Sequence, residues 1–342
     1  MHVIIDRQKF IESVQDVLKA ISSKAIIPIL TGIKIEIKEN GIYLTGSDSD
    51  ISIERFIPIK EDEHEYISIH KVGSIVLQAR VFSEIIRKLP STTVEIIVNE
   101  DLITTIQSGN SVFQLNGLDP DEYPRLPNLD DHRYFEIEAQ VLKHMIKQTV
   151  FAVSTSETRP ILTGVNLSYE NENLQCVATD SHRLALRNVS LENISDNLSF
   201  ANVIVPGKSM NELEKIIDDN DEQIKVVVTD HFILFQAKHI LFYSRLLEGN
   251  YPDVSKLIPT DSSTSIIVQT KSLLQAVERA SLLARESNNN VVKLTDIDGA
   301  KLEIVATAPE IGKVVETVET ETDGGSEVWI AVSAKEMLDA LR

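Results

Sequence analysis

The sequence of 342 residues contains one cysteine, Cys176, and lacks the usual catalytic and nucleotide-binding signatures. A single cysteine excludes an intramolecular disulfide and a cysteine-rich metal centre. The eight histidines are scattered without H-E-x-x-H or similar ligand spacing, and there is no G-x-S-x-G, P-loop or G-x-G-x-x-G motif. We therefore expect no catalytic residue, no metal and no cofactor.

Long apolar runs are also missing. No stretch is long enough to span a bilayer, and residues 1–7 lack the apolar core of a signal peptide. The contents of hydrophobic residues (42%) and charged residues (25%) are ordinary for a globular chain. Together these features favour a protein of the cytoplasm with no membrane partner.

The most informative feature of the sequence is a long internal repeat. The pentapeptide PILTG occupies residues 28–32 and again 160–164, and the offset of 132 residues is the same between Asp48 and Asp180. A third, diverged copy matches residues 302–307 (LEIVAT) to residues 174–179 (LQCVAT), 128 residues apart. Repeats of solenoid proteins are much shorter, so this period indicates tandem domains.

Each copy begins with an amphipathic helix, continues in strands of alternating hydrophobicity, and then repeats the order of helix and strands. Turns such as Asn40-Gly41 and Asp298-Gly299 separate the strands. We expect an α+β fold of three tandem domains, each a sheet with two helices on one face, at residues 1–128, 129–259 and 260–342. The helices are expected at residues 7–20, 80–88, 141–150, 208–217, 271–285 and 335–342.

The third copy ends within its second helix. We therefore expect this copy to be incomplete. Its strands over residues 291–318 would lack partners, which would make it less stable than the other two copies.

Charge is distributed unevenly. The net charge is −19, but the expected helices contain 15 Lys or Arg against 8 Asp or Glu, a sum of +7, which leaves −26 for the rest of the chain. Positive helices and negative sheets could reflect a nucleic-acid surface on the helices. The alternative is that Lys and Arg simply favour helices, although Glu does so too.

Two short motifs suggest chemistry that the sequence does not support. Asp180-Ser181-His182 contains the three residue types of a hydrolase triad, but neighbours in one strand point to opposite faces. Asp48-Ser49-Asp50 could suggest calcium, but no EF-hand loop follows.

Five motifs resemble one family along the whole chain: PIL at residues 28–30, VATDSHRLA at 177–185, VPGK at 205–208, GNYPD at 249–253 and NNVV at 289–292. In these motifs the chain resembles the bacterial sliding clamps, the beta subunits of DNA polymerase III. The resemblance implies a DNA clamp fold in which two subunits close head to tail into a ring of six domains. The helices would line the hole, the sheets would form the outer wall, and duplex DNA would pass through without being read in sequence.

The resemblance also implies partners and sites. The partners would be a second copy, duplex DNA, the replicative polymerase, the clamp loader and other proteins that carry clamp-binding peptide motifs. The residues expected to contact DNA, in or just after the lining helices, are Lys24, Arg80, Lys147, Arg159, Lys208, Arg279 and Arg285. The peptide cleft between the second and third domains would use Leu162, Thr179, Ser181, His182, Arg183, Leu184, Pro252, Lys256 and Leu257. The dimer interface would use Phe113, Leu282 and Leu283.

Two other functions remain open at this point. One is a repeat scaffold that binds no DNA, and the other is a hydrolase that uses Asp180, Ser181 and His182. Clamps of this family continue for some dozens of residues, so we expect this sequence to be a C-terminally shortened member, either as a fragment or as a truncated gene product.

Overall fold

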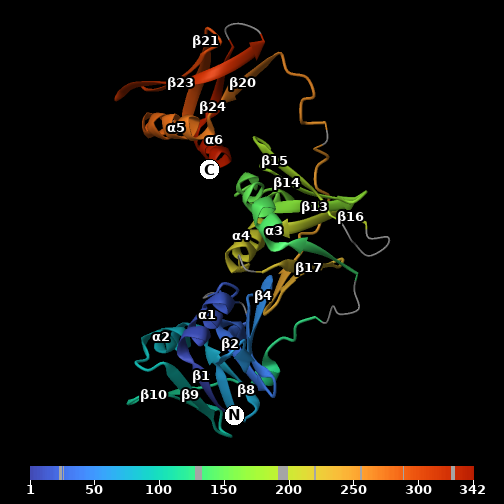
Figure 1. Cartoon of the computed structure of the whole chain (residues 1–342), viewed down its shortest axis with the longest axis vertical. Helices are drawn as coiled ribbons and strands as arrows, with labels where there is room; N and C mark the ends of the chain where they lie inside the picture. The colour runs from blue at the N-terminus through green and yellow to red at the C-terminus, as the bar shows by residue number, and fades with distance from the viewer. Residues whose placement is uncertain are drawn as a thin grey trace. The chain divides into compact units, whose positions relative to one another are not determined.

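The computed structural model describes residues 1–22, 25, 27–127, 133–191, 199–218, 221–254, 256–287, 289–324 and 328–342. Tertiary contacts divide the chain into two compact units, Met1–Tyr251 and Pro252–Arg342. Figure 1 shows the elements of both. No helix in the described ranges is both long and apolar enough to cross a membrane.

The six expected helices are confirmed, with bounds that differ by one or two residues from the prediction at most ends. They are α1 (Arg7–Leu18), α2 (Ala79–Lys88), α3 (Ala139–Lys147), α4 (Gly207–Ile216), α5 (Thr270–Ala284) and α6 (Ala334–Leu341). In α1, Phe10, Val14 and Val17 recur at helical spacing and are buried. The carboxylate of Asp6 caps this helix by accepting a hydrogen bond from the Lys9 N–H at 2.8 Å.

The first unit contains three larger sheets and one hairpin. The five-stranded sheet has the order β11 (Ser111–Asn116), β10 (Ile103–Ser108), β9 (Thr93–Val98), β1 (His2–Asp6), β7 (Ile67–Lys71). The eight-stranded sheet has the order β12 (Tyr134–Glu138), β17 (Gln223–Val228), β18 (Phe232–Ala237), β19 (Ile240–Arg245), β4 (Ile51–Pro58), β3 (Gly41–Ser47), β2 (Gly32–Lys38), β8 (Gly73–Gln78). The four-stranded sheet has the order β15 (Leu184–Ser190), β14 (Asn173–Thr179), β13 (Gly164–Glu170), β16 (Phe200–Pro206). The hairpin pairs β5 (Lys60–Glu61) with β6 (His64–Glu65).

The expectation of one sheet per copy was wrong for the first two copies. In these copies the strand that leads into each helix pairs with strands of the other half of its copy: β1 pairs with β9, β8 with β2, β12 with β17 and β16 with β13. This exchange gives each of the two copies strands in two sheets, and α1 packs on strands of both in the first copy. Hydrophobic alternation reveals each strand but not which strand it pairs with.

The first two copies are fused through their backbones. Strand β19 of the second copy pairs with β4 of the first in antiparallel register, with Phe242 opposite Ile53. Both side chains are fully buried, and one hydrophobic core runs from Met1 to Phe242 through both copies. The seam between the copies is therefore a continuous part of the sheet and the core.

The second unit has one sheet, in the order β20 (Thr264–Val268), β23 (Gly312–Gly324), β22 (Lys301–Ala308), β21 (Val291–Ile297), β24 (Trp329–Ser333). Its core lies between this sheet and α5 and includes Val277, Val292 and Ile304. The expectation that strands over residues 291–318 lack partners was wrong, because β24 and β20 flank them and each has strand partners.

Candidate nucleic-acid interface

Four helices of the first unit form the candidate DNA-facing surface. Figure 1 shows α1 and α2 beside the strands of the first copy, and α3 and α4 beside those of the second. The two pairs meet where the Lys19 ammonium, just after α1, donates to the carbonyl of Lys215 in α4 at 3.3 Å. Helices from both copies therefore lie next to each other across the seam.

The positive charge of the helices is concentrated in two of them. Within the observed bounds, α2 and α3 each carry +2, α1 and α4 are balanced, and the six helices together hold 12 Lys or Arg against 8 Asp or Glu. The expected sum of +7 falls to +4 because Lys19, Arg285 and Arg342 lie just past the helix ends. The asymmetry between helices and the rest of the chain remains, since the whole chain carries −19.

The seven cations expected at DNA fall into two groups. Arg80, Arg159 and Arg285 are exposed, and among the residues that the structure describes no carboxylate forms an ion pair with them. The other described members have acidic partners: Lys147 with Glu214 at 3.1 Å, Lys208 with Asp48 at 2.8 Å, and Arg279 with Glu316 at 2.7 Å. Lys24 lies outside the described residues.

The pair in the second unit has the stronger geometry. Arg279 donates from Nε and from one terminal nitrogen to the two carboxylate oxygens of Glu316, at 2.8 and 2.7 Å. These hydrogen bonds lower the pKa of Glu316. A phosphate that binds Arg279 must compete with a carboxylate that is already in place.

The repeated loops after β3 and β14 have the same conformation. The Asp48 carboxylate accepts from the N–H groups of Asp50 and Ile51 at 3.1 and 2.8 Å. In the second copy, Asp180 accepts from His182 and Arg183 at 2.9 and 3.0 Å. Ser49 and Ser181 occupy the left-handed region with φ of 81° and 80°. The repeat is therefore preserved in hydrogen bonding as well as in sequence.

The surroundings of the two loops differ. The first loop is engaged by the second copy: the Lys208 ammonium donates to the Asp48 carboxylate, and the Arg245 N–H donates to the Asp50 carbonyl at 2.8 Å. In the second loop, the Asp180 carboxylate accepts from Arg183 of the same loop at 3.1 Å. The strand that follows the second loop, β15, lies at the edge of its sheet within the first unit.

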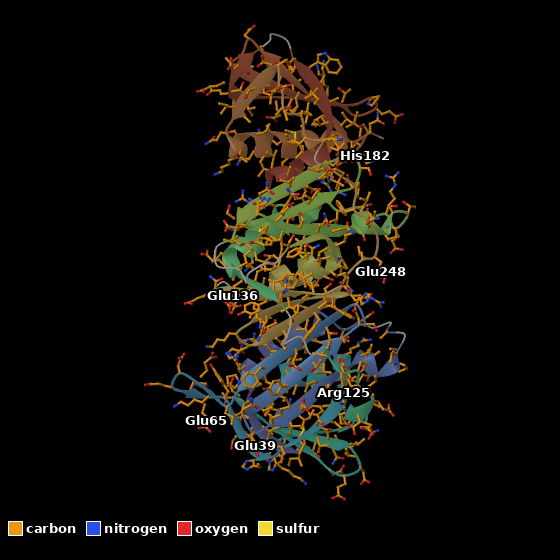
Figure 2. The ribbon with its side chains drawn as sticks, turned by 90° about the vertical axis from the view of Figure 1, so that its right-hand side faces the viewer. Glu39, Glu65, Arg125, Glu136, His182 and Glu248 are labelled. Atoms are coloured by element: carbon orange, nitrogen blue, oxygen red, sulfur yellow. The ribbon has the colours of Figure 1, made fainter. Side chains whose placement is uncertain are left out.

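The expected cleft residues of the first unit gather around this second loop. Leu162 and Thr179 are buried, Leu184 is half-buried, and Ser181 and His182 are exposed. The side chain of His182 is labelled in Figure 2. Pro252, Lys256 and Leu257 belong to the second unit, where Leu257 is 62% exposed. Five of the nine expected residues therefore lie within residues 179–184 of the first unit, and Leu162 lies in the same unit.

Sequence reasoning missed two residues that support the loop. The Tyr251 hydroxyl accepts a hydrogen bond from the Thr179 N–H at 3.0 Å, and burial raises the pKa of Tyr251 to about 12. The Arg183 guanidinium lies over the Phe151 ring, 5.5 Å from its centroid. The repeated Tyr-Pro pairs at residues 123–124 and 251–252 were the available signal for Tyr251, whereas Phe151 had none.

The geometry does not assemble a hydrolase triad. Asp180, Ser181 and His182 lie in the turn between β14 and β15, so placing them within one strand was wrong. Burial raises the pKa of Asp180, but hydrogen bonds from the N–H groups of His182 and Arg183 and the Arg183 guanidinium outweigh it and hold this pKa below its ordinary value. The Ser181 hydroxyl accepts from Arg159 at 3.1 Å, and its contacts in the described chain do not include the His182 ring. In the described ranges no three His, Cys, Asp or Glu side chains are placed to hold a metal.

Two unpaired strand edges carry exposed apolar side chains. On β11, Val112 and Phe113 are 57% and 40% exposed. On β23, the edge opposite β22 has no strand partner over residues 312–319 in the described chain, and Val315 is 49% exposed. Leu282 is 65% exposed, whereas Leu283 packs partly against the core of its own unit.

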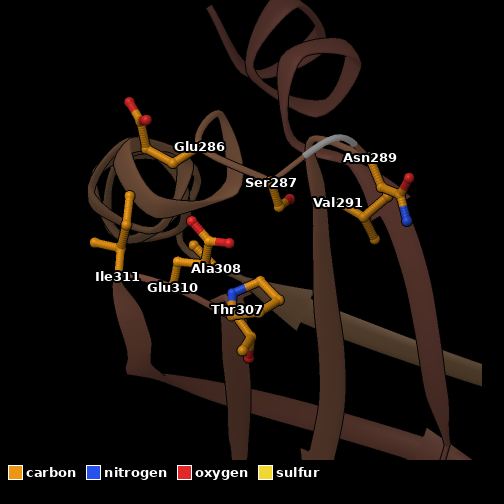
Figure 3. Close-up of a pocket in the computed structure, with 9 residues that line it drawn as sticks. Glu286, Ser287, Asn289, Val291, Thr307, Ala308, Glu310 and Ile311 are labelled. Carbon is orange, nitrogen blue, oxygen red and sulfur yellow. The ribbon is translucent and has the colours of Figure 1, made fainter.

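A hollow of about 760 Å³ lies at the start of β21 and the end of β22 (Figure 3). It is lined by the end of the segment after α5, including Glu286 and Asn289, and by the turn between β22 and β23, including Glu310 and Ile311. Ile311 is 61% exposed.

Comparisons with known proteins agree along the whole chain. The family models of the DNA polymerase III beta subunit match with the N-terminal domain at residues 1–127, the central domain at 136–253 and the C-terminal domain at 255–342. The beta sliding clamp of Bacillus subtilis is 57% identical over 342 residues, which is 100% of this chain and 90% of that relative.

Solved structures give the same result. The crystal structure of the DNA polymerase sliding clamp from Bacillus subtilis matches with a TM-score of 0.95 and 57% identity, covering 100% of this chain and 89% of that one. The DnaN sliding clamp from Bartonella birtlesii bound to griselimycin matches with a TM-score of 0.88 and 28% identity, over 100% of this chain and 89% of that one.

Proposed function

The chain belongs to the family of DNA polymerase III beta subunits, the beta sliding clamps, and we propose that it works as a ring of two copies closed around duplex DNA. Its role in replication is that of a processivity factor, an accessory subunit of the polymerase without catalysis of its own. We also propose that the three domains span residues 1–128, 129–259 and 260–342, and that the protein acts in the cytoplasm.

The observation that supports a closed ring of two subunits is the seam between the first two copies within one chain. There, β19 of the second copy pairs with β4 of the first copy. The equivalent strand of the first copy is β11, since β10–β11 and β18–β19 are hairpins that both close over two residues. The equivalent of β4 in the second copy is β15, which follows Thr179. Thr307 of the third copy matches Thr179, and the strand that follows Thr307 is β23, so β23 is the equivalent of β4 in the third copy. Both β11 and this part of β23 have a free edge in the described chain.

The seam also predicts the register of the contact between the two subunits of the ring. Phe242 opposite Ile53 in the seam corresponds to Phe113 of one subunit opposite Val314 of the other subunit. Val112 then faces Val315, and the exposed apolar side chains of both edges become covered. An antiparallel pairing of this kind satisfies the free backbone groups of both strands and buries the apolar anchors that usually carry an interface. Leu282 and Leu283 flank it, with Leu282 as the more exposed of the two.

DNA contact is proposed for the seven cations of the lining helices. Lys24, Arg80, Lys147, Arg159, Lys208, Arg279 and Arg285 would face phosphates, which gives binding that depends on salt and not on sequence. The positive sums of α2 and α3 support this role. Arg80, Arg159 and Arg285 should contribute most, because no ion-pair partner has to be displaced from them in the described chain.

Partner binding is proposed at the second loop and its surroundings. The first loop is already filled by Lys208 and β19, whereas the second has the same conformation without such a neighbour in its unit. A short peptide with apolar residues suits the buried Leu162 and the half-buried Leu184, with Ser181, His182 and Arg183 as polar contacts. Pro252, Lys256 and Leu257 are proposed as the remaining residues of this cleft. Its ligands would be the replicative polymerase, the clamp loader and other proteins with clamp-binding motifs.

The test combines mass and topology. Analytical ultracentrifugation should give the mass of two chains, and a preformed ring loaded on nicked circular DNA should stay bound until the circle is cut. A repeat scaffold without DNA binding would elute alone from both circular and linear DNA. Release from the uncut circle as fast as from the linear form would refute the closed ring.

A further inference from the structure

The seam between the first two copies carries a second connection besides the paired strands. Immediately after β4, the chain forms the β5–β6 hairpin. The base of this hairpin is held by backbone hydrogen bonds from Tyr66 and Ile67 to the Ile59 carbonyl, at 2.8 and 3.3 Å. The hairpin belongs to the first copy.

The carboxylate of Glu61 in this hairpin contacts three side chains at once, those of Lys9, Lys238 and His239. Its Oε1 accepts from Lys238 at 2.6 Å and contacts the His239 Nε2 at 2.8 Å, and its Oε2 accepts from Lys9 at 3.4 Å. Lys238 and His239 form the turn between β18 and β19 of the second copy, whereas Lys9 lies in the first turn of α1 in the first copy. One carboxylate thus joins both copies.

The surrounding groups hold these side chains in place. The Phe56 N–H donates to the His239 carbonyl at 2.9 Å, and the two rings lie 5.8 Å apart. The Lys9 ammonium lies over the Tyr66 ring at 4.9 Å. Hydrogen bonds from Lys238 and His239 lower the pKa of Glu61 to about 2, so the carboxylate is charged near neutral pH.

The position of this cluster matters more than its strength. Lys208 binds Asp48 just before β4 begins, and Glu61 follows just after β4 ends. The two ion pairs therefore hold opposite ends of the β4–β19 seam. The backbone pairing covers only residues 51–55 of β4, so side-chain contacts at both ends of this short seam limit the twist of one copy against the other.

We propose that Glu61 with Lys9, Lys238 and His239 forms a strut that fixes the angle between the first and second copies. The strut is a conformational device of the chain itself and needs neither DNA nor a second chain. The ion pair of Lys208 with Asp48, at the other end of the seam, lies in the DNA-facing surface. When a DNA phosphate displaces Asp48 from Lys208, the contacts of Glu61 are the ones that still hold the angle between the two copies.

The test compares Glu61→Gln with Glu63→Gln, a matched change at an exposed residue of the same hairpin. Spin labels on Glu100→Cys and Arg187→Cys report the distance between the copies, since both positions are exposed and Cys176 is fully buried with a pKa raised to about 12. We expect Glu61→Gln to broaden the distance distribution and to raise amide exchange at Ile53, Phe56 and Phe242 roughly tenfold, and Glu63→Gln to change neither.

A second variant keeps the proposal testable if Glu61→Gln folds poorly. Lys238→Met leaves Glu61 in contact with Lys9 and His239, so we expect a smaller broadening, and adding Lys238→Met to Glu61→Gln should cause no further change. An unchanged distance distribution and unchanged exchange in both single variants would overturn the strut. These measurements use the free chain, so they do not depend on DNA binding or ring closure.

Discussion

The division of the DNA-facing cations into free and paired residues makes a quantitative prediction about salt. Each phosphate that a cation neutralises contributes about 0.9 to the slope of log affinity against log salt. Replacing Arg80 and Arg159 together by Gln removes two free cations and should reduce the slope by about 1.8. Replacing Lys147 and Lys208 by Gln should reduce it by less than about 0.9, because Glu214 and Asp48 already neutralise these residues.

The assay is fluorescence anisotropy of a short linear duplex, whose ends let a closed ring thread on, between about 50 and 200 mM salt. The matched control is Lys71→Gln with Lys301→Gln, which removes the same charge from exposed positions on β7 and β22. The control should leave the slope unchanged. Equal slope changes in all three double variants would show that net charge alone matters, and a larger change for the paired lysines would refute the reasoning from ion pairs.

Three further predictions follow from other parts of the structure. Phe113→Ala with Leu282→Ala should yield monomers at micromolar concentration in analytical ultracentrifugation, and dimers that persist would exclude both residues from the interface. Phe82→Ala, which empties a fully buried site in edge contact with Phe10, should lower the free energy of unfolding by about 3–5 kcal/mol in urea titrations, and a loss below 1 kcal/mol would contradict tight packing there. Glu61→Gln should be less stable than the parent chain near neutral pH, because a depressed pKa of Glu61 stabilises the folded state above about pH 4.5. This difference in stability should disappear as the pH falls from 4.5 toward 2, and a difference that persists at pH 2 would mean that the charge of Glu61 is not its cause.

The elements of this fold could be predicted from the sequence where the signal is local. Helical spacing placed α1 to α6 to within a few residues, and the repeat aligned Asp48 with Asp180, whose loops share a conformation. The features that could not be predicted depend on pairing between segments that are distant in the sequence. Lys208 and Asp48 are 160 residues apart, and nothing near either residue indicates the other.

The same limit explains the two errors about strands. The strands of the third copy were expected to lack partners because that copy ends within its second helix. The pairings of β20 with β23 and of β24 with β21 join segments that lie far apart in the sequence. Asp180 to His182 looked like a strand continuation because the residues on both sides alternate. A turn made by one serine at φ of 80° has no hydrophobic pattern to reveal it.

The continuous core of the first two copies has a consequence for how the molecule melts. Residues from Met1 to Phe242 share one apolar cluster, and residues from Leu273 to Leu338 form another. Duplicated sequence does not therefore mean three independent melting events. In calorimetry the first 251 residues should unfold in a single cooperative transition and the remainder in its own. Damage deep in the first copy, such as the loss of Phe82, would then also lower the melting temperature of the second copy, while the last 91 residues kept theirs.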